Sequence, residues 1–383
     1  MEPPQPRGGS VRAVTRQRYR GHHGGSVQDE TPVGESAAGS WTDRLKLWGG
    51  LALGLGLMSW FLGSLEWRSL IAVMSEVRWS WIGLAAILML ADYAVHAWRW
   101  RVLLHHVDPE LDWRTLWAAT TVLWGFNTLL PLRAGNFLRP AVVSLRRSIP
   151  YTTLLFTSIA EYVCDIFGIV LLILGMIWLI PEAMIAEGPL EDIKIWGTLS
   201  GVGALLSLLV VVLLSSRQAR SVIELLLRPI PSDRVRARVL ELFDQLVLGM
   251  AAVGHPLRLF QALALTLLIW GGWLLAILAT FRAFDLEIPL VGALFWESSL
   301  TLSMLLPQAP GYLGVFQVVT EESLRLFEAP VAKAEAIALV FWTICFVPIT
   351  VLGVYDGSRA GLSLGRNPLQ GAMDELEPPT DPV

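Results

Sequence analysis

Long apolar stretches separated by short polar ones are the main pattern of this chain. Six stretches with few charged residues approach or exceed the roughly 20 residues that a membrane-spanning helix needs. They lie at 47–65, 79–98, 151–180, 195–216, 259–281 and 336–355. The pattern predicts an all-α polytopic membrane protein with about six full spans.

Two further apolar stretches, 115–132 and 288–306, are followed by proline and glycine. Each ends in Leu-Leu-Pro-x-x-x-Gly, at 129–135 and at 305–311. Proline and glycine interrupt helices, and two interrupted segments in corresponding halves of a membrane protein point to a binding site between structural repeats. The residues that we assign to these backbone breaks are Pro131, Gly135, Pro307, Pro310, Gly311 and Gly314.

The distribution of Lys and Arg favours a particular topology. If every apolar stretch spans, these residues divide almost evenly between the two sides, contrary to the positive-inside rule. If each Leu-Leu-Pro segment forms a re-entrant hairpin, most of them lie on the cytoplasmic side together with both termini. The two halves, about 79–180 and 259–355, then become inverted repeats, which is a transporter architecture. The broken segments should meet inside the fold, because irregular backbone at membrane depth must be covered by protein or line a cavity.

The polar parts of the chain set the domain boundaries. Residues 1–40 are rich in Gly, Pro, Ser, Gln and Arg, and we expect a disordered basic cytoplasmic tail. Residues 41–364 form the transmembrane domain, and 365–383 a second disordered tail. Between the repeats, 217–253 contains apolar residues at helical spacing opposite charged ones, which predicts an amphipathic helix at the membrane interface.

Charged residues within the apolar stretches are candidates for function, because they are costly in a membrane. Arg133 and Arg139 follow the first Leu-Leu-Pro, and guanidinium groups match phosphate oxygens bidentately, so we predict that they bind a lipid headgroup. Glu161 and Asp165, one turn apart on a helix, would be counterions or polar partners of the ligand. An alternative that remains open, and is compatible, is a buried ion-pair cluster that holds the hairpin.

Two amides complete the predicted headgroup site. Asn136 and Gln317 follow the glycines of the two broken segments, and each is equally suited to a headgroup or to nearby exposed backbone.

Composition excludes several other classes of protein. Hydrophobic residues make up 54% of the chain and charged residues only 16%, which rules out a soluble globular domain. Cys164 and Cys345 both lie in apolar stretches, so we expect free thiols. The paired histidines lack further ligands at metal spacing, and no glycine-rich nucleotide-binding loop of the Walker type is present. We expect no metal, no cofactor and no nucleic-acid partner.

Several segments together resemble the transmembrane region of lysylphosphatidylglycerol synthetases and the related flippase-like membrane family, over about 47–364. They are Trp-Arg-Trp-Arg at 98–101, Leu-Leu-Pro-x-Arg-x-Gly-x-x-x-Arg at 129–139, Glu161-x-x-x-Asp165, and Pro-Gly-Tyr-Leu-Gly-Val-Phe at 310–316. The family pattern tends to have a glutamate after each glycine element, where this chain has Asn136 and Gln317. The aminoacylating members also carry a soluble C-terminal synthase domain, and the polar residues after 355 are too few for one. We therefore expect no aminoacyl transfer.

The resemblance implies a lipid translocase of the cytoplasmic (inner) membrane that moves or presents a polar or anionic lipid between leaflets. The lipid would be a phospholipid, glycolipid or hopanoid, with a lipid-biosynthesis enzyme as a further partner, and an oligomer is compatible with the sequence. The alternative is a non-transporting scaffold that presents lipid to such an enzyme. A third interpretation, an intramembrane enzyme, would require acid/base chemistry from Glu161 and Asp165, and we expect instead that the chain is not an enzyme.

Overall fold

A computed structural model describes residues 67–130, 133–147, 149–179, 232–252, 254–304 and 310–360, together with scattered positions at 59–63, 195–206 and 223–227. The predicted tails at 1–40 and 365–383, and the proline positions Pro131 and Pro307, lie outside the described residues. Most of the predicted spans at 47–65 and 195–216 do too, so the structure does not test the expected number of spans.

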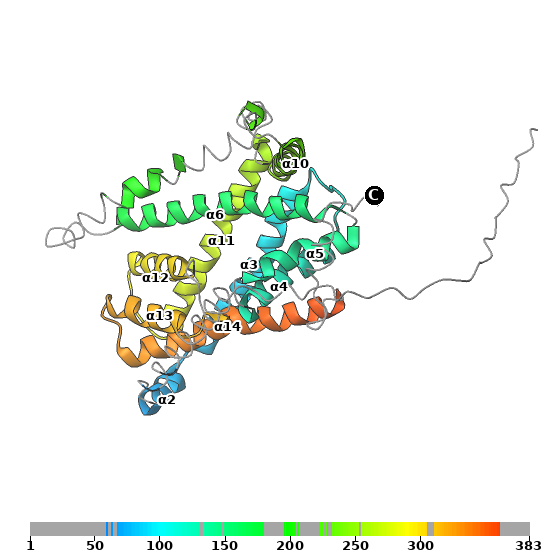
Figure 1. Ribbon diagram of the computed structural model, residues 1–383. Helices are drawn as coiled ribbons and strands as arrows, with labels where there is room; N and C mark the ends of the chain where they lie inside the picture. The colour runs from blue at the N-terminus through cyan, green and yellow to red at the C-terminus, as the bar shows by residue number, and fades with distance from the viewer. Residues whose placement is uncertain are drawn as a thin grey trace, which may run out of the picture. The chain divides into compact units, whose positions relative to one another are not determined.

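The described part of the chain is helical and contains no strand, as the pattern predicted (Figure 1). Four helices are long and apolar enough to cross a membrane: α3 (Trp79–Leu104), α6 (Tyr151–Leu179), α11 (Pro256–Ala283) and α14 (Val331–Arg359). Each overlaps a predicted span. Helix α3 runs six residues beyond the predicted end at 98 because Arg99 is buried against protein, where its charge does not end the helix.

The remaining helices are shorter. They are α2 (Trp67–Glu76), α4 (Trp113–Leu129), α5 (Gly135–Arg147), α10 (Asp233–Gly249), α12 (Leu290–Ser303) and α13 (Val315–Arg325), with a 3₁₀ turn η2 (Pro310–Tyr312) before α13. Helices α4 and α5 pack against each other, as do α12 and α13. The order long, short, short, long therefore occurs twice, in α3–α6 and in α11–α14. These two groups cover 79–179 and 256–359.

The start of α4 shows how local sequence fixes a helix end. Asp112 is its N-cap, and one carboxylate oxygen accepts a hydrogen bond of 2.9 Å from the backbone N–H of Thr115. Partial burial acts to raise the pKa of Asp112, but the hydrogen bonds from Thr115 and the charge of Arg147, 3.2 Å away, outweigh it. The pKa of this carboxyl group therefore lies below its usual value, and the cap is charged.

Contacts between the two halves form the core of the fold. Helix α3 packs along α11, and α4 packs along α14. The second contact is close because glycines face each other where α4 and α14 cross. A Cβ atom added at Gly125 would lie 2.9 Å from the Cα atom of Gly353. Small residues that let two backbones approach are the usual way to pack helices in a membrane.

Candidate functional site

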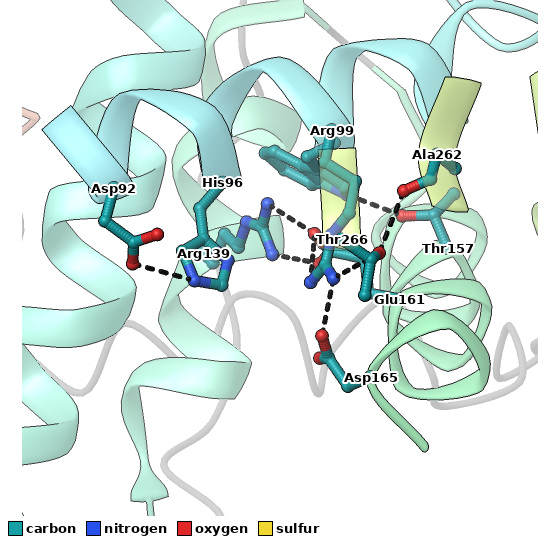
Figure 2. Close-up of polar contacts among 10 residues, drawn as sticks. Asp92, His96, Arg99, Arg139, Thr157, Glu161, Asp165, Ala262 and Thr266 are labelled. Atoms are coloured by element: carbon teal, nitrogen blue, oxygen red, sulfur yellow. Dashed lines mark hydrogen bonds and ion pairs between the residues drawn. The ribbon is translucent and has the colours of Figure 1, made fainter. Parts of the chain in front are cut away.

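Three helices bring four charged side chains together in the interior of the fold. Arg99 comes from α3, Arg139 from α5, and Glu161 and Asp165 from α6 (Figure 2). Arg99, Arg139 and Glu161 are each at most 5% exposed. We call these four residues the charged cluster.

Arg139 and Glu161 form a two-pronged ion pair. Both terminal nitrogens of the guanidinium group contact the carboxylate, and the longer contact, Nη2 to Oε1, is 3.3 Å. The guanidinium group also lies 3.7 Å from the ring centre of Trp100, a cation–π contact. The indole N–H of Trp100 in turn donates a 3.0 Å hydrogen bond to Thr157. Arg139 is therefore held on both sides.

Arg99 connects the two carboxylates. Its Nη1 atom lies 2.5 Å from Oδ1 of Asp165, and its Nη2 atom lies 3.8 Å from Oε1 of Glu161. Nη1 also donates a 3.1 Å hydrogen bond to the hydroxyl of Thr266 on α11, so the second half of the fold contributes to the cluster. Two arginines and two carboxylates balance, and the cluster is formally neutral.

Access differs among the four members. The Asp165 side chain is 30% exposed, whereas the side chains of Arg99, Arg139 and Glu161 are at most 7% exposed. Asp165 is therefore the member of the cluster with the most exposed side chain.

A second polar group follows along the same face of α3, as Figure 2 shows. His96 lies 3.5 Å from the carboxylate of Asp92, one turn away, and its ring packs edge-on against Trp124 at 5.1 Å. Asp92 and His96 are buried, and neither carboxylate oxygen of Asp92 has a hydrogen-bond partner among the described residues. Asp92 also interacts electrostatically with Glu297 of α12, which is fully buried and lacks such a partner within the described part of the fold.

The predicted site residues are only partly brought together. Arg139, Glu161 and Asp165 join the cluster, whereas Arg133 is partly buried, has a left-handed backbone (φ 54°) and forms no ion pair with any described residue. The prediction did not include Arg99 in the site. The signal was in the sequence, because Asp92, His96 and Arg99 are spaced by four and three residues and so share one helix face.

The two amides contact the protein itself. The side-chain oxygen of Gln317, fully buried, accepts a 2.8 Å hydrogen bond from the backbone N–H of Gly314 and so caps α13. The side-chain oxygen of Asn136 accepts a 3.2 Å hydrogen bond from the amide of Asn127 on α4. In this structure Gln317 satisfies backbone, which was one of its two expected roles.

Glycines shape both broken segments. A Cβ atom at Gly135 would overlap the backbone carbonyl of Leu123, so only glycine lets α5 start this close to α4. Gly311 and Gly314 have φ angles of 75° and 83°, a region that side chains disfavour. The indole of Trp342 on α14 donates a 2.7 Å hydrogen bond to the carbonyl of Gly311 and satisfies exposed backbone there. Pro310, the remaining predicted break, begins η2.

The described residues contain no group of three or more His, Cys, Asp and Glu side chains placed to hold a metal ion. Cys164 and Cys345 are free, buried thiols.

Apolar helices around a buried charged cluster define an integral membrane protein with a polar interior. The chain belongs to the family of the lysylphosphatidylglycerol synthase transmembrane region, which matches residues 47–353. It is also 26% identical, over 328 residues, to the glycosyltransferase AglD of Haloferax volcanii. That match covers 78% of this chain and 51% of AglD, so the chain spans about half the length of this curated relative. The family match and the four long apolar helices identify the chain as an integral membrane protein.

Proposed function

We propose that this protein is a lipid translocase of the cytoplasmic membrane that moves or presents a polar or anionic lipid between leaflets. The observation that carries the proposal is the charged cluster. Ionisable side chains are rare inside membranes, and where they occur they usually mark a path for a polar substrate. The cluster joins residues from α3, α5 and α6 and reaches α11 of the second half through Thr266.

The neutrality of the cluster suggests how a headgroup would bind. A lipid phosphate or other anion entering beside Asp165 would take the place of the Asp165 carboxylate as the partner of Arg99. Replacement avoids leaving a guanidinium group unpaired in a medium of low dielectric constant, which is the main cost of breaking a buried ion pair. The partial exposure of Asp165 supports this residue as the exchangeable partner.

The short helices support the proposed inverted repeats with re-entrant hairpins. Helices α4, α5, α12 and α13 contain 17, 13, 14 and 11 residues, below the roughly 20 that a span needs. As hairpins they would enter and leave on one side, and the positive-inside distribution then places both termini in the cytoplasm.

The test uses the purified protein in liposomes with fluorescent phospholipids in both leaflets. Dithionite quenches only the outer leaflet unless lipids exchange. We expect wild type to give quenching beyond the outer leaflet, and the double variant Arg99→Gln/Asp165→Asn, which keeps the cluster neutral, to lose it. The matched control is Arg78→Gln/Asp285→Asn, which removes an exposed ion pair of 3.0 Å and should leave exchange unchanged.

The alternative is a scaffold that presents lipid to a separate enzyme. The relative AglD is a glycosyltransferase, which favours this second candidate because the matched part is only half of that protein. Protection of the inner leaflet in wild type, for anionic, zwitterionic and glycosylated lipids, would contradict the translocase and favour the scaffold.

We propose further that the chain is not itself an enzyme. Each acidic residue of the cluster is engaged by an arginine, which suits a structural or binding carboxylate better than a proton donor. A chemically altered lipid after incubation with the purified protein, lost in Glu161→Gln, would refute this.

A further inference from the structure

A second polar site lies apart from the charged cluster, at the end of the fold where α4 begins and α5 and α14 end. It is a depression of about 510 Å³. Its rim carries Arg114 at the start of α4, Arg146 at the end of α5 and Arg359 at the end of α14. Two consecutive helices and the distant α14 therefore place guanidinium groups around one hollow, which we call the arginine rim.

The arginine rim has an excess of positive charge. Asp356 is the one acidic residue that lines the hollow, and it already accepts a 2.7 Å hydrogen bond from the hydroxyl of Thr121. Arg114, Arg146 and Arg359 make no ion pair within the described part of the chain. Arg359 rests on the ring of Tyr355, 4.8 Å from its centre. This site therefore differs from the charged cluster, in which each arginine has a carboxylate.

The rest of the hollow is apolar and reaches below the rim. Ala94 of α3 lies ten residues before the end of its helix, and Ala118 lies five residues into α4, so the lining extends at least a helical turn along these two helices. Trp113 and Trp117 complete it. Tryptophan is typical of the boundary between headgroups and acyl chains.

We infer that this hollow binds a phospholipid with an anionic headgroup, with its phosphate among Arg114, Arg146 and Arg359 and the upper part of its acyl chains against Trp117 and the two alanines. Charge complementarity selects the anion, because arginine pairs bidentately with phosphate oxygens. The apolar lining selects an amphiphile over free phosphate. The carboxylate of Asp356 beside the rim repels a second negative charge close to it. Its oxygens can accept hydrogen bonds from a headgroup that carries hydroxyl groups.

The inference deepens the proposed function, on which it rests for its biological role: the arginine rim would capture the lipid that the charged cluster then admits. The position of the rim at a helix end, where headgroups lie, suits capture. The buried and neutral cluster suits passage.

The experiment uses the full-length protein in nanodiscs of phosphatidylcholine that contain a small fraction of photoactivatable phosphatidylglycerol. Cross-linked peptides are identified by mass spectrometry. We expect labelling of the peptides that contain Trp113–Trp117 and Tyr355–Arg359, with apparent affinity about fivefold weaker for each arginine replaced in Arg114→Gln, Arg146→Gln and Arg359→Gln. Arg101→Gln is the matched control, since it removes an exposed arginine of α3 that does not line the hollow, and labelling should be unchanged.

Two further arms identify the ligand. Photoactivatable phosphatidylcholine should label these peptides weakly, and inorganic phosphate should not compete at concentrations that leave electrostatic screening unchanged. Equal labelling of wild type and of a variant with all three arginines replaced by Gln would overturn the inference. Equal labelling by the two lipids, or full competition by inorganic phosphate, would also overturn it. Leaflet exchange is measured separately. Specific labelling without leaflet exchange would support the lipid site and count against translocation. Leaflet exchange without specific labelling would support translocation and count against the lipid site.

Discussion

Replacing Glu161 by Met tests whether the charged cluster is as interdependent as its geometry indicates. The substitution removes one of two carboxylates and leaves Arg99 and Arg139, both nearly inaccessible to solvent, to share Asp165. Met has a similar volume to Glu, so the change in packing is small. The expected effect is therefore mainly electrostatic.

The magnitude follows from the ion-pair geometry. At 3.3 Å between Nη2 of Arg139 and Oε1 of Glu161, the attraction is about 5 kcal/mol for an effective dielectric constant of about 20. In the native protein this offsets the cost of removing both charges from water. Without Glu161 the cost of removing the Arg139 charge from water remains, and the attraction between the two side chains is lost. We expect the free energy of unfolding to fall by about 3–5 kcal/mol.

A double-mutant cycle isolates this effect. The variants are Glu161→Met, Arg139→Met and the double replacement, and the measurement is chemical unfolding in mixed micelles followed by tryptophan fluorescence. Each single variant should be strongly destabilised. The double variant should be within about 1–2 kcal/mol of wild type, because both buried charges are gone and Met retains a favourable contact with Trp100.

Additive effects would refute this reasoning. If the double variant loses as much stability as the sum of the two single variants, each residue acts through packing alone and the ion pair contributes nothing. A single Glu161→Met variant with wild-type stability would contradict the burial of the two arginines. The control is Glu322→Met, which removes an exposed carboxylate 3.0 Å from Arg325 and should change stability by less than about 1 kcal/mol.

Three further predictions concern other parts of the fold. Gly353→Ala should cost about 1–3 kcal/mol, because the new Cβ would meet backbone of α4, whereas Gly271→Ala, with nothing within 4 Å, should not destabilise; unfolding midpoints compare the two. Asp112 has a depressed pKa, so its contribution to stability is present above the unfolded value of about 4 and is lost as the pH falls through the folded value. Asp112→Asn, an equally good N-cap, should remove this loss of stability below about pH 4, and an unchanged acid profile would contradict it. Glu297→Met should stabilise by about 1–3 kcal/mol, opposite in sign to Glu161→Met, because Glu297 has no hydrogen-bond partner among the described residues; destabilisation would reveal a partner.

Hydrophobic periodicity was enough to find the long helices, and local chemistry was enough to place the glycines. The four described helices that are long and apolar enough to cross a membrane overlap four predicted stretches, because apolar length is a local property. Gly135 could be assigned to a backbone break from its position after Leu-Leu-Pro. The contact that requires it, with the carbonyl of Leu123, depends on how α5 folds back on α4 and could not be predicted.

The partners within the site could not be predicted from spacing. Arg133 and Arg139 are equivalent by composition, yet only Arg139 forms an ion pair with a carboxylate among the described residues. Arg133 precedes α5 and has a left-handed backbone, a local geometry that spacing alone does not reveal. Arg99 is adjacent to Trp98, Trp100 and Arg101, which is typical of a span leaving the membrane. Its burial depends on Thr266 and Asp165, which lie 167 and 66 residues away in the sequence.

The arginine rim is exposed and the charged cluster is buried, so a change in salt concentration can test which of the two the lipid meets first. The rim is exposed, so its attraction for an anionic headgroup is screened by ions, with a screening length of about 8 Å at physiological ionic strength. The ion pairs of the cluster are buried and are screened far less. If the rim captures lipid before the cluster admits it, raising the salt concentration from about 0.05 to 0.5 M should weaken labelling at the rim and slow exchange of anionic lipid, and leave the unfolding free energy nearly constant. Slower exchange with unchanged labelling would place the screened step elsewhere. A large loss of stability in the same salt range would show that the cluster itself is open to solvent, contrary to its burial.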